Sequence, residues 1–351
     1  MDKVCWNGTV INPACYAYVY QTDVQPYFDI ATNYGFANYM FQTNEGPSFE
    51  AHQFLFTGTS AGVAPNDNYS LDFVAENAVP NDDSGCSEGQ VNLPKWVDPT
   101  GTNEFHDPRP TKAQCYPHDS LVTCGTGKNC DKGVSWAYYT PTPETIWTAP
   151  AAIPEVCYGE NDLNYLGQSC GTANGGTEWK DHVFLQTQSD GAPIFDALLN
   201  CTLPQITWVI PDKVWSDHAG LTGLYGPSYV GDIVDAVGGG MAKSSCNFTG
   251  SGKYWTQEPT AIFILWDDWG GCFDHVNRPP CTPAPRHRVP PMFSRTAAAA
   301  AMFTVSVCPC WWFPNTLRRA PSPANAARRD TRPVASIRAR SSRTFTISAA
   351  S

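Results

Sequence analysis

Basic side chains are scarce over most of this 351-residue chain. Residues 1–276 contain 10 Lys and Arg against 32 Asp and Glu, a net charge of -22, and Arg109 is the one arginine among them. Nucleic-acid backbones are bound by clustered Lys and Arg, so this acidic body excludes nucleic acid as a partner. A phosphate ester remains a compatible substrate if a bound cation supplies the positive charge.

Three further features are missing. Met1 is not followed by a basic and then apolar leader, so we see no signal peptide. The longest uncharged apolar run, Ala297 to Phe313, contains Ser, Thr, Cys and Pro and is short for a transmembrane segment. None of the 14 Cys residues forms a pair at zinc-site spacing. The cysteines therefore favour disulfides and an extracytoplasmic setting.

The last part of the chain has the opposite charge. Residues 277–351 contain 12 Arg, no Lys and a single acid, Asp330, a net charge of +11. Two segments so different in composition are rarely parts of one evolved domain. We therefore expect a domain over residues 1–276 and an aberrant tail, rich in Arg, Ala and Pro, over residues 277–351.

The pattern of apolar residues predicts an α/β fold. A helix-like run covers Tyr27 to Met40, and residues 66–200 read as long loops with short strands, pinned by disulfides. We expect a strand at Gln205–Ile210, a helix at Ser228–Val237 and a buried strand at Thr260–Trp266. This order is typical of an open sheet, whose functional groups follow the carboxyl ends of its strands.

Asp267 and Asp268 directly follow the last of these strands. Adjacent carboxylates at the end of a buried strand repel each other, and a divalent cation would relieve that repulsion. Asp274 and His275 come shortly afterwards and are suitable ligands for zinc, manganese or iron. The alternative is a strand-to-turn junction in which an aspartate caps a helix.

Ser48 follows Gly46-Pro47, which predicts a tight turn that holds the hydroxyl outward. A serine hydroxyl needs a base or a metal to become a nucleophile. On local sequence alone, we prefer the interpretation of Ser48 as a turn serine that caps the next helix. His52 and His218 gain interest only from their neighbours, because a lone histidine in a polar loop is usually a surface residue.

Three segments together resemble the phosphoesterases that include bacterial phospholipase C and acid phosphatase. Their order and spacing match the family over most of residues 16–276. The segments are FQTNEGPSFEAHQFLFTGTSAG at 41–62, WVIPDKVWSDHAG with GPSYVGDIVDAVG within 208–238, and YWTQEPTAIFILWDDWGGCFDHV at 254–276.

The resemblance implies an alkaline-phosphatase-like α/β/α sandwich, incomplete at both ends of this chain. It implies that Ser48 is the nucleophile and that Asp267 and Asp268 bind a divalent metal ion. It also implies that His218 and His275 are active-site residues and that His52 lies near the phosphate. The expected substrate is a phosphate monoester or diester, including phospholipids, and the full-length family form is expected to be secreted or periplasmic.

This chain departs from the family at both ends. Members begin with a strand and a Glu-Asn pair that supplies metal ligands, and nothing similar precedes Ser48. The tail after about residue 277 resembles the family in a neighbouring reading frame. Because Trp has one codon, Cys310 to Phe313 read two bases later encodes Leu-Val-Val. We therefore expect a frameshift product, and a copy that is inactive or unstable as encoded.

Two other functions remain open on the sequence. A secreted, disulfide-braced binding domain without enzymatic activity would use the aromatic residues to bind glycans. An enzyme of the same fold could instead hydrolyse sulfate esters or transfer phosphate, because a fold alone does not define the reaction.

Overall fold

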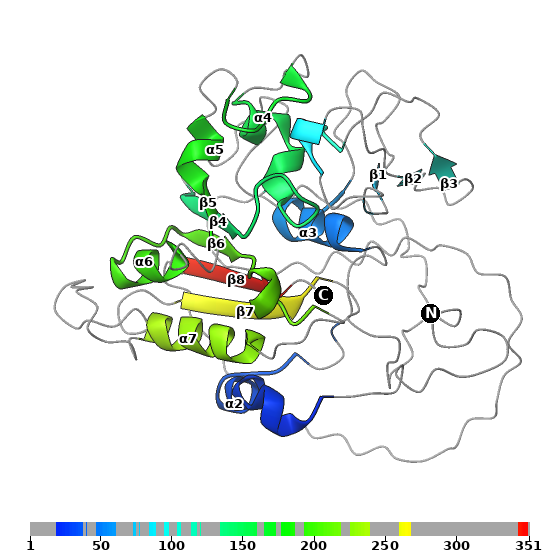
Figure 1. The fold of residues 1–351 in the computed structure, drawn as a ribbon. Helices are drawn as coiled ribbons and strands as arrows, with labels where there is room; N and C mark the ends of the chain where they lie inside the picture. Colours follow the sequence, from blue (N-terminus) through cyan, green and yellow to red (C-terminus); the bar gives the residue numbers. More distant parts are fainter. Residues whose placement is uncertain are drawn as a thin grey trace, which may run out of the picture.

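A parallel sheet forms the centre of the computed structural model (Figure 1). Its strand order is β5-β4-β6-β8-β7, and all neighbouring strands run parallel. The strands are β4 (Trp136–Thr140), β5 (Val183–Leu185), β6 (Ile206–Val209), β7 (Thr260–Trp266) and β8 (Arg343–Ala349). The structure describes residues 19–37, 40, 47–60, 73–74, 77, 84–88, 95–97, 104–106, 114–117, 120, 134–159, 165–172, 177–186, 193–218, 225–238, 260–267 and 343–349.

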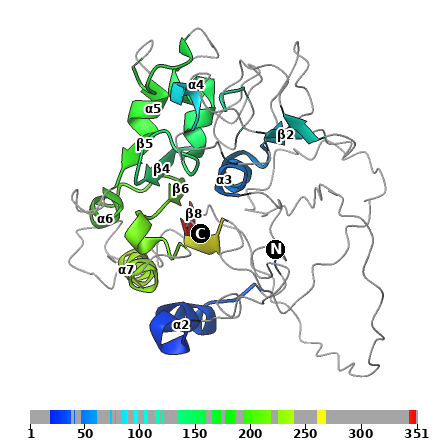
Figure 2. The ribbon, with the colours of Figure 1, turned by 45° about the vertical axis from the view of Figure 1, so that its right-hand side comes forward.

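Helices cover both faces of this sheet, because successive strand residues point to opposite sides. Ala137 and Tyr139 of β4 pack on one face with α6 (Pro193–Leu199) and α7 (Gly226–Gly238). Trp136 and Tyr138 of the same strand pack on the other face with α3 (Ser48–Thr57) and η4 (Ala149–Ala152). Figure 2 shows α7 between the sheet and α2 (Gln25–Asn33). The described residues therefore form a three-layered α/β arrangement.

The remaining elements are short. An antiparallel three-stranded sheet, in the order β1-β2-β3, lies apart from the parallel sheet. These elements are η2 (Gln21–Val24), β1 (Phe73–Val74), η3 (Cys86–Glu88), β2 (Lys95–Val97), β3 (Glu104–His106), α4 (Pro154–Cys157), α5 (Thr177–His182) and η8 (Lys213–Trp215).

The predicted elements after residue 200 are confirmed. The strand expected at Gln205–Ile210 is β6, and the helix expected at Ser228–Val237 is α7, which begins two residues earlier at Gly226. The strand expected at Thr260–Trp266 is β7 with the same bounds. The expected burial of β7 is wrong, however: its residues are half-buried, and Trp266 is exposed. The reason is that, among the described strands, β7 pairs with β8 alone and lies at the edge of the sheet.

Two predictions for the first 200 residues are corrected by the structure. The helix expected at Tyr27–Met40 is α2, which begins at Gln25 and ends at Asn33. Pro26 fits the first turn of a helix, where its missing N–H is not needed. The region 66–200 contains disulfides and short strands as expected, but it also supplies β4 and β5 of the main sheet.

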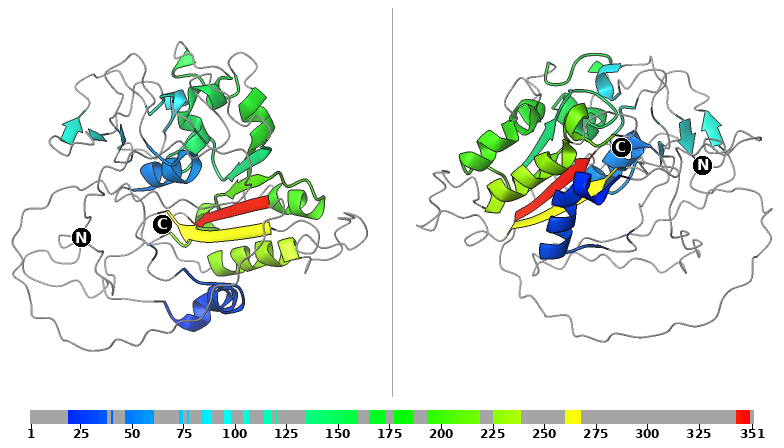
Figure 3. Two further views of the ribbon diagram at one scale, coloured as in Figure 1. Left: turned by 180° about the vertical axis from the view of Figure 1, so that it is seen from behind. Right: turned by 60° about the horizontal axis from the view of Figure 1, so that its bottom comes forward.

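Strand β8 belongs to the tail that we expected to lie outside the domain. It pairs in parallel with β6 on one side and with β7 on the other (Figure 3). Seven residues of the tail, Arg343–Ala349, are therefore part of the sheet. The division at residue 277 and the frameshift concern the origin of the tail, and both stay predictions. Among the described residues, no helix is both long and apolar enough to cross a bilayer.

Candidate active site

Ser48 is the first residue of α3 and is almost buried. The residue that precedes the helix as its N-cap is Pro47, so Ser48 does not occupy the capping position that local sequence allowed. The backbone N–H of Phe49 donates to the side-chain oxygen of Asn77 at 2.9 Å. Ser48 and His52 are four residues apart on one helix, so both lie on the same side of α3.

The helix that carries Ser48 is held firmly against the sheet. Phe56 is fully buried, and its ring centroid lies 4.8 Å from that of Trp208 and 5.7 Å from that of Tyr138. The indole N–H of Trp208 also donates to the carbonyl of Leu55 at 3.1 Å. These contacts fix α3 over β4 and β6, and they determine where Ser48 and His52 lie.

His52 connects α3 to the end of β7. Its Nε2 lies 3.4 Å from Oδ2 of Asp267, and neither side chain is exposed to solvent. The distance is that of an ion pair, although the geometry does not make a hydrogen bond. Its Nδ1 lies 3.4 Å from the hydroxyl of Tyr138. The structure therefore brings two predicted site residues, His52 and Asp267, into contact, with the predicted nucleophile one helical turn away.

Tyr138 on β4 lies next to this pair, in contact with His52. Its hydroxyl donates to the carbonyl of Trp147 at 2.7 Å and accepts from the N–H of Ala149 at 3.4 Å. Burial raises the pKa of Tyr138 well above its usual value, and the charge of Asp267 raises it further. The phenol therefore stays protonated and neutral, and it adds no second negative charge beside the buried carboxylate.

His218 comes from a different segment, the loop that follows β6. Asp212 caps η8 by accepting from the N–H of Val214 at 3.2 Å, and the N–H of His218 donates to Ser216 Oγ at 3.1 Å. His218 itself is exposed. Since β6 and β7 are parallel members of one sheet, His218 and Asp267 follow carboxyl ends at the same edge.

The metal-site prediction is only partly covered by the structure. Asp268 and His275 lie outside the described residues, so their roles stay predictions. Within the described part, no three His, Cys, Asp or Glu residues gather closely enough to hold a metal ion. Asp267 supplies a buried carboxylate and Ser48 a nearly buried hydroxyl. These oxygen donors fit a hard divalent cation.

Sequence reasoning missed two buried residues around the site. Tyr138 lies in WAYYT, a run of aromatic residues that could have indicated a strand, but its polar surroundings suggested a loop. Glu50 is in the first turn of α3 and is 2% exposed. A buried glutamate beside a predicted nucleophile is a signal of function, but burial was not visible in the sequence.

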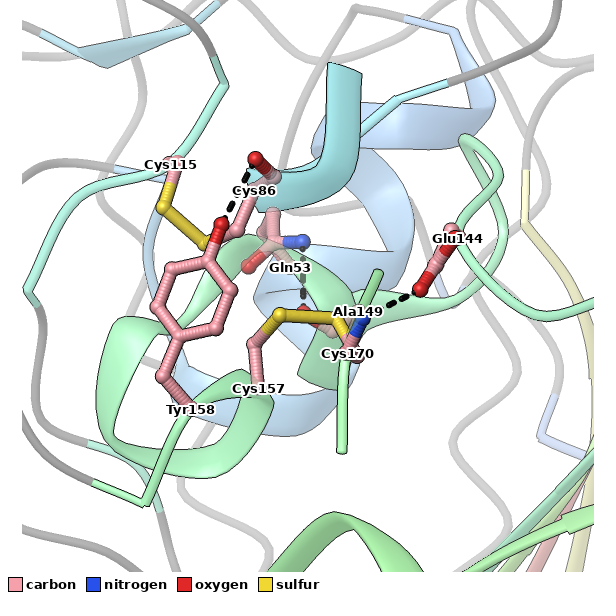
Figure 4. The surroundings of a disulfide bond; sticks show 8 residues. All are labelled: Gln53, Cys86, Cys115, Glu144, Ala149, Cys157, Tyr158 and Cys170. Carbon is pink, nitrogen blue, oxygen red and sulfur yellow. Dashed lines mark hydrogen bonds between the residues drawn. A yellow bond between two sulfur atoms is a disulfide. The ribbon is translucent and has the colours of Figure 1, made fainter. Parts of the chain in front are cut away.

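A disulfide cluster lies beside α3, on the side that carries Gln53 (Figure 4). The bonds Cys86–Cys115 and Cys157–Cys170 confirm that cysteines pin the region 66–200. The side-chain amide of Gln53 on α3 donates to the carbonyl of Ala149 at 3.2 Å, and Ala149 begins the η4 turn that leads into this cluster. The hydroxyl of Tyr158 donates to the carbonyl of Cys86 at 2.8 Å.

Comparison with known proteins identifies the family of the chain. A model of the phosphoesterase family matches residues 12–294, which is most of the chain. The chain belongs to the phosphoesterase family. The match includes Ser48, His52, His218, Asp267 and their surroundings, and it confirms the resemblance seen in the three sequence segments.

Two curated relatives of this chain are named phospholipases. Non-hemolytic phospholipase C of Burkholderia pseudomallei is 31% identical over 166 residues, which cover 44% of this chain and 21% of the relative. Non-hemolytic phospholipase C of Pseudomonas aeruginosa is 30% identical over 90 residues, which cover 25% of this chain and 11% of the relative. The matched part therefore spans about a fifth or less of each relative. No solved structure matches the chain.

Proposed function

We propose that this phosphoesterase hydrolyses phosphate esters, with Ser48 as the nucleophile and with an alkaline-phosphatase-like fold. The observation that carries the proposal is the contact between His52 and Asp267, which joins the helix of Ser48 to the strand end with the predicted metal ligands. Two phospholipase C relatives support phosphate esters as substrates, and a phospholipid is one candidate. A secreted or periplasmic location is part of the same proposal.

Ser48 cannot depend on His52 as its base in the way of a serine protease. Both ring nitrogens of His52 face other groups, Nδ1 the Tyr138 hydroxyl and Nε2 the Asp267 carboxylate. We therefore assign His52 the task of holding Asp267 in place. Asp267 and Asp268 would bind a divalent cation, which lowers the pKa of a serine hydroxyl and offsets charge on the phosphate oxygens.

The reaction then needs two displacements at phosphorus. The hydroxyl of Ser48 loses its proton to solvent, and its oxygen forms a bond to phosphorus while the bond to the leaving alcohol breaks. The departing oxygen takes a proton from His218 or His275. Water next attacks the phosphoserine, the bond between phosphorus and the Ser48 oxygen breaks, and one water proton returns to the histidine while solvent reprotonates the serine. The nearly buried position of Ser48 at the start of a fixed helix limits its freedom before attack.

The test measures whether the full chain hydrolyses three substrates, with and without added divalent metal. The substrates are a chromogenic phosphate monoester, a phosphocholine diester and a sulfate ester. Turnover should depend on metal and disappear in Ser48→Ala. Ser169→Ala is the matched control, because Ser169 is exposed and far along the chain in the disulfide-braced region. The preferred ester separates phosphatase, phospholipase C and sulfatase activity.

Two results would contradict the proposal. Equal turnover by Ser48→Ala and the control would exclude Ser48 as the nucleophile. A folded, metal-loaded chain that hydrolyses none of the three esters would show that this copy is not a hydrolase. That result would favour the disulfide-braced binding domain instead.

A further inference from the structure

Asp217 has an unusual backbone and lies directly before His218. Its φ of 57° is in the left-handed region, which is uncommon for residues other than glycine. Such a conformation persists only where surrounding contacts hold it, and it is often found at functional sites. Asp217 is half-buried, whereas His218 next to it is exposed. The contacts of Asp217 therefore decide the direction in which the chain presents His218.

Two elements from distant parts of the chain hold Asp217. From α2, the hydroxyl of Tyr27 donates to Oδ2 of Asp217 at 2.5 Å. Burial raises the pKa of the Asp217 carboxyl above its usual value, and hydrogen bonds from the Tyr27 hydroxyl and from the backbone of Gly226, at the N-terminus of α7, partly offset that rise. A Cβ atom on Gly226 would clash with the carboxylate of Asp217, so a larger residue at position 226 would push the carboxylate away. Asp217 is therefore in close contact with α2 on one side and with α7 on the other.

Tyr27 also contacts β7, the strand that leads into Asp267. Its ring meets the ring of Trp266 edge to face, with centroids 5.2 Å apart, and Trp266 is the residue before Asp267. Tyr27 thus contacts both Asp217, which precedes His218, and Trp266, which precedes Asp267. Burial and the hydrogen bond to Asp217 raise the pKa of Tyr27 above its usual value, so the hydroxyl remains a donor at neutral pH.

From these contacts we propose that Tyr27 and Asp217 are positioning residues that set the place of His218 relative to Asp267. The proposal rests on the proposed function, in which His218 is an active-site residue. The rival explanation is structural: Asp217 would only cap α7, and Tyr27 would only fasten α2 to the domain. The two explanations differ in whether His218 itself responds when the Tyr27 hydroxyl is removed.

The experiment uses the full chain labelled with isotopes at histidine and follows the His218 imidazole by NMR, assigned with His218→Gln. Tyr27→Phe keeps the ring on Trp266 and removes only the hydroxyl. Tyr34→Phe is the matched control, because it makes the same chemical change on an exposed ring just after α2. The His218 signals should shift in Tyr27→Phe and stay in place in Tyr34→Phe, while the His182 signals stay constant in both.

Kinetics on the phosphate ester give the second readout. Tyr27→Phe should lower kcat by about 10- to 100-fold with little change in KM, because small displacements of catalytic groups have effects of that size. Asp217→Asn keeps an acceptor for the Tyr27 hydroxyl and should retain more activity than Asp217→Ala. Tyr34→Phe should match the unmodified chain.

Unchanged His218 signals in Tyr27→Phe would overturn the proposal. A loss of stability without a change at His218 is the result expected if Tyr27 only attaches α2 to the domain. Equal kcat values for Tyr27→Phe and Tyr34→Phe would also overturn it. If the unmodified chain hydrolyses no ester, the proposed function fails separately, and the NMR shift alone decides whether Tyr27 and Asp217 position His218.

Discussion

The candidate site lies between two elements, which we call its walls: α3, which carries Ser48 and His52, and β7, which leads into Asp267. The two walls are held in place in different ways. On one wall, α3 buries seven of its ten residues and packs Phe56 among the aromatic side chains of β4 and β6. On the other, β7 has no buried residue, lies at the edge of the sheet and, within the described part of the chain, pairs with β8 alone. The contact between His52 and Asp267 joins the two walls. The place of Ser48 therefore depends on a dense core, and the place of Asp267 on strand pairing.

The order of β7 and β8 is the reverse of what their sequences predict. The TAIFILW sequence of β7 is continuously apolar apart from its first residue, as expected for an interior strand of a parallel sheet. The RTFTISA sequence of β8 alternates hydroxyl-bearing and apolar residues, as expected nearer an edge. Yet β8 lies inside and β7 at the edge. Apolar content alone therefore does not determine the position of a strand.

The largest effect is expected on the α3 wall. Phe56→Ala should lower the free energy of unfolding by about 3–5 kcal/mol, because it leaves a cavity among Trp136, Tyr138 and Trp208. Chemical denaturation measures the change. Phe28→Ala, on the exposed side of α2, is the control and should change stability by about 0.5 kcal/mol or less. Equal losses in the two variants would show that the α3 wall is not the denser one.

A proline in β8 tests the other wall. Thr346 pairs with Trp208 of β6 and with Phe263 of β7, so Thr346→Pro interrupts a ladder inside the sheet. We expect a loss of about 1–3 kcal/mol, the usual penalty for leaving a buried hydrogen-bonding group unmatched. Hydrogen exchange should become faster in residues 260–267 and change less in residues 136–140. Thr346→Val keeps the N–H and is the control; an equal loss of protection in both segments would contradict the comparison.

The smallest effect is expected at the disulfide cluster beside α3. Tyr158→Phe removes the hydrogen bond to Cys86 and should cost about 1 kcal/mol. Burial raises the pKa of Tyr158 to about 12, above its value of about 10 in an unfolded chain. Its contribution to stability is therefore fully present below pH of about 10 and is lost as the pH rises through about 12.

Denaturation at several alkaline pH values measures this dependence. The unmodified chain should lose stability over that pH range, and Tyr158→Phe should lose less. Tyr20→Phe, on an exposed ring, is the control and should keep the pH dependence of the unmodified chain. An identical pH dependence in all three proteins would exclude Tyr158 as its source.

The parts of the fold and site that could be predicted are those set by local pattern. The apolar run of β7 predicted the strand, and the position of Asp267 directly after it is read from the same local pattern. The contact of His52 with Asp267, and of Tyr27 with Asp217, joins segments far apart in the chain and depends on packing that no local pattern contains. Strand β8 was missed because an arginine-rich tail gives no sign of an interior strand.

The central claim is that Ser48 is the residue to which phosphorus is transferred. The most direct measurement is mass spectrometry of the peptide that contains Ser48, after the full chain and divalent metal are mixed with a phosphate monoester and quenched in acid. The account predicts a phosphoryl group on Ser48, and none on the same peptide from Ser48→Ala. Hydrolysis of the ester without phosphate on Ser48 at any time point, or the same label in Ser48→Ala, would contradict it.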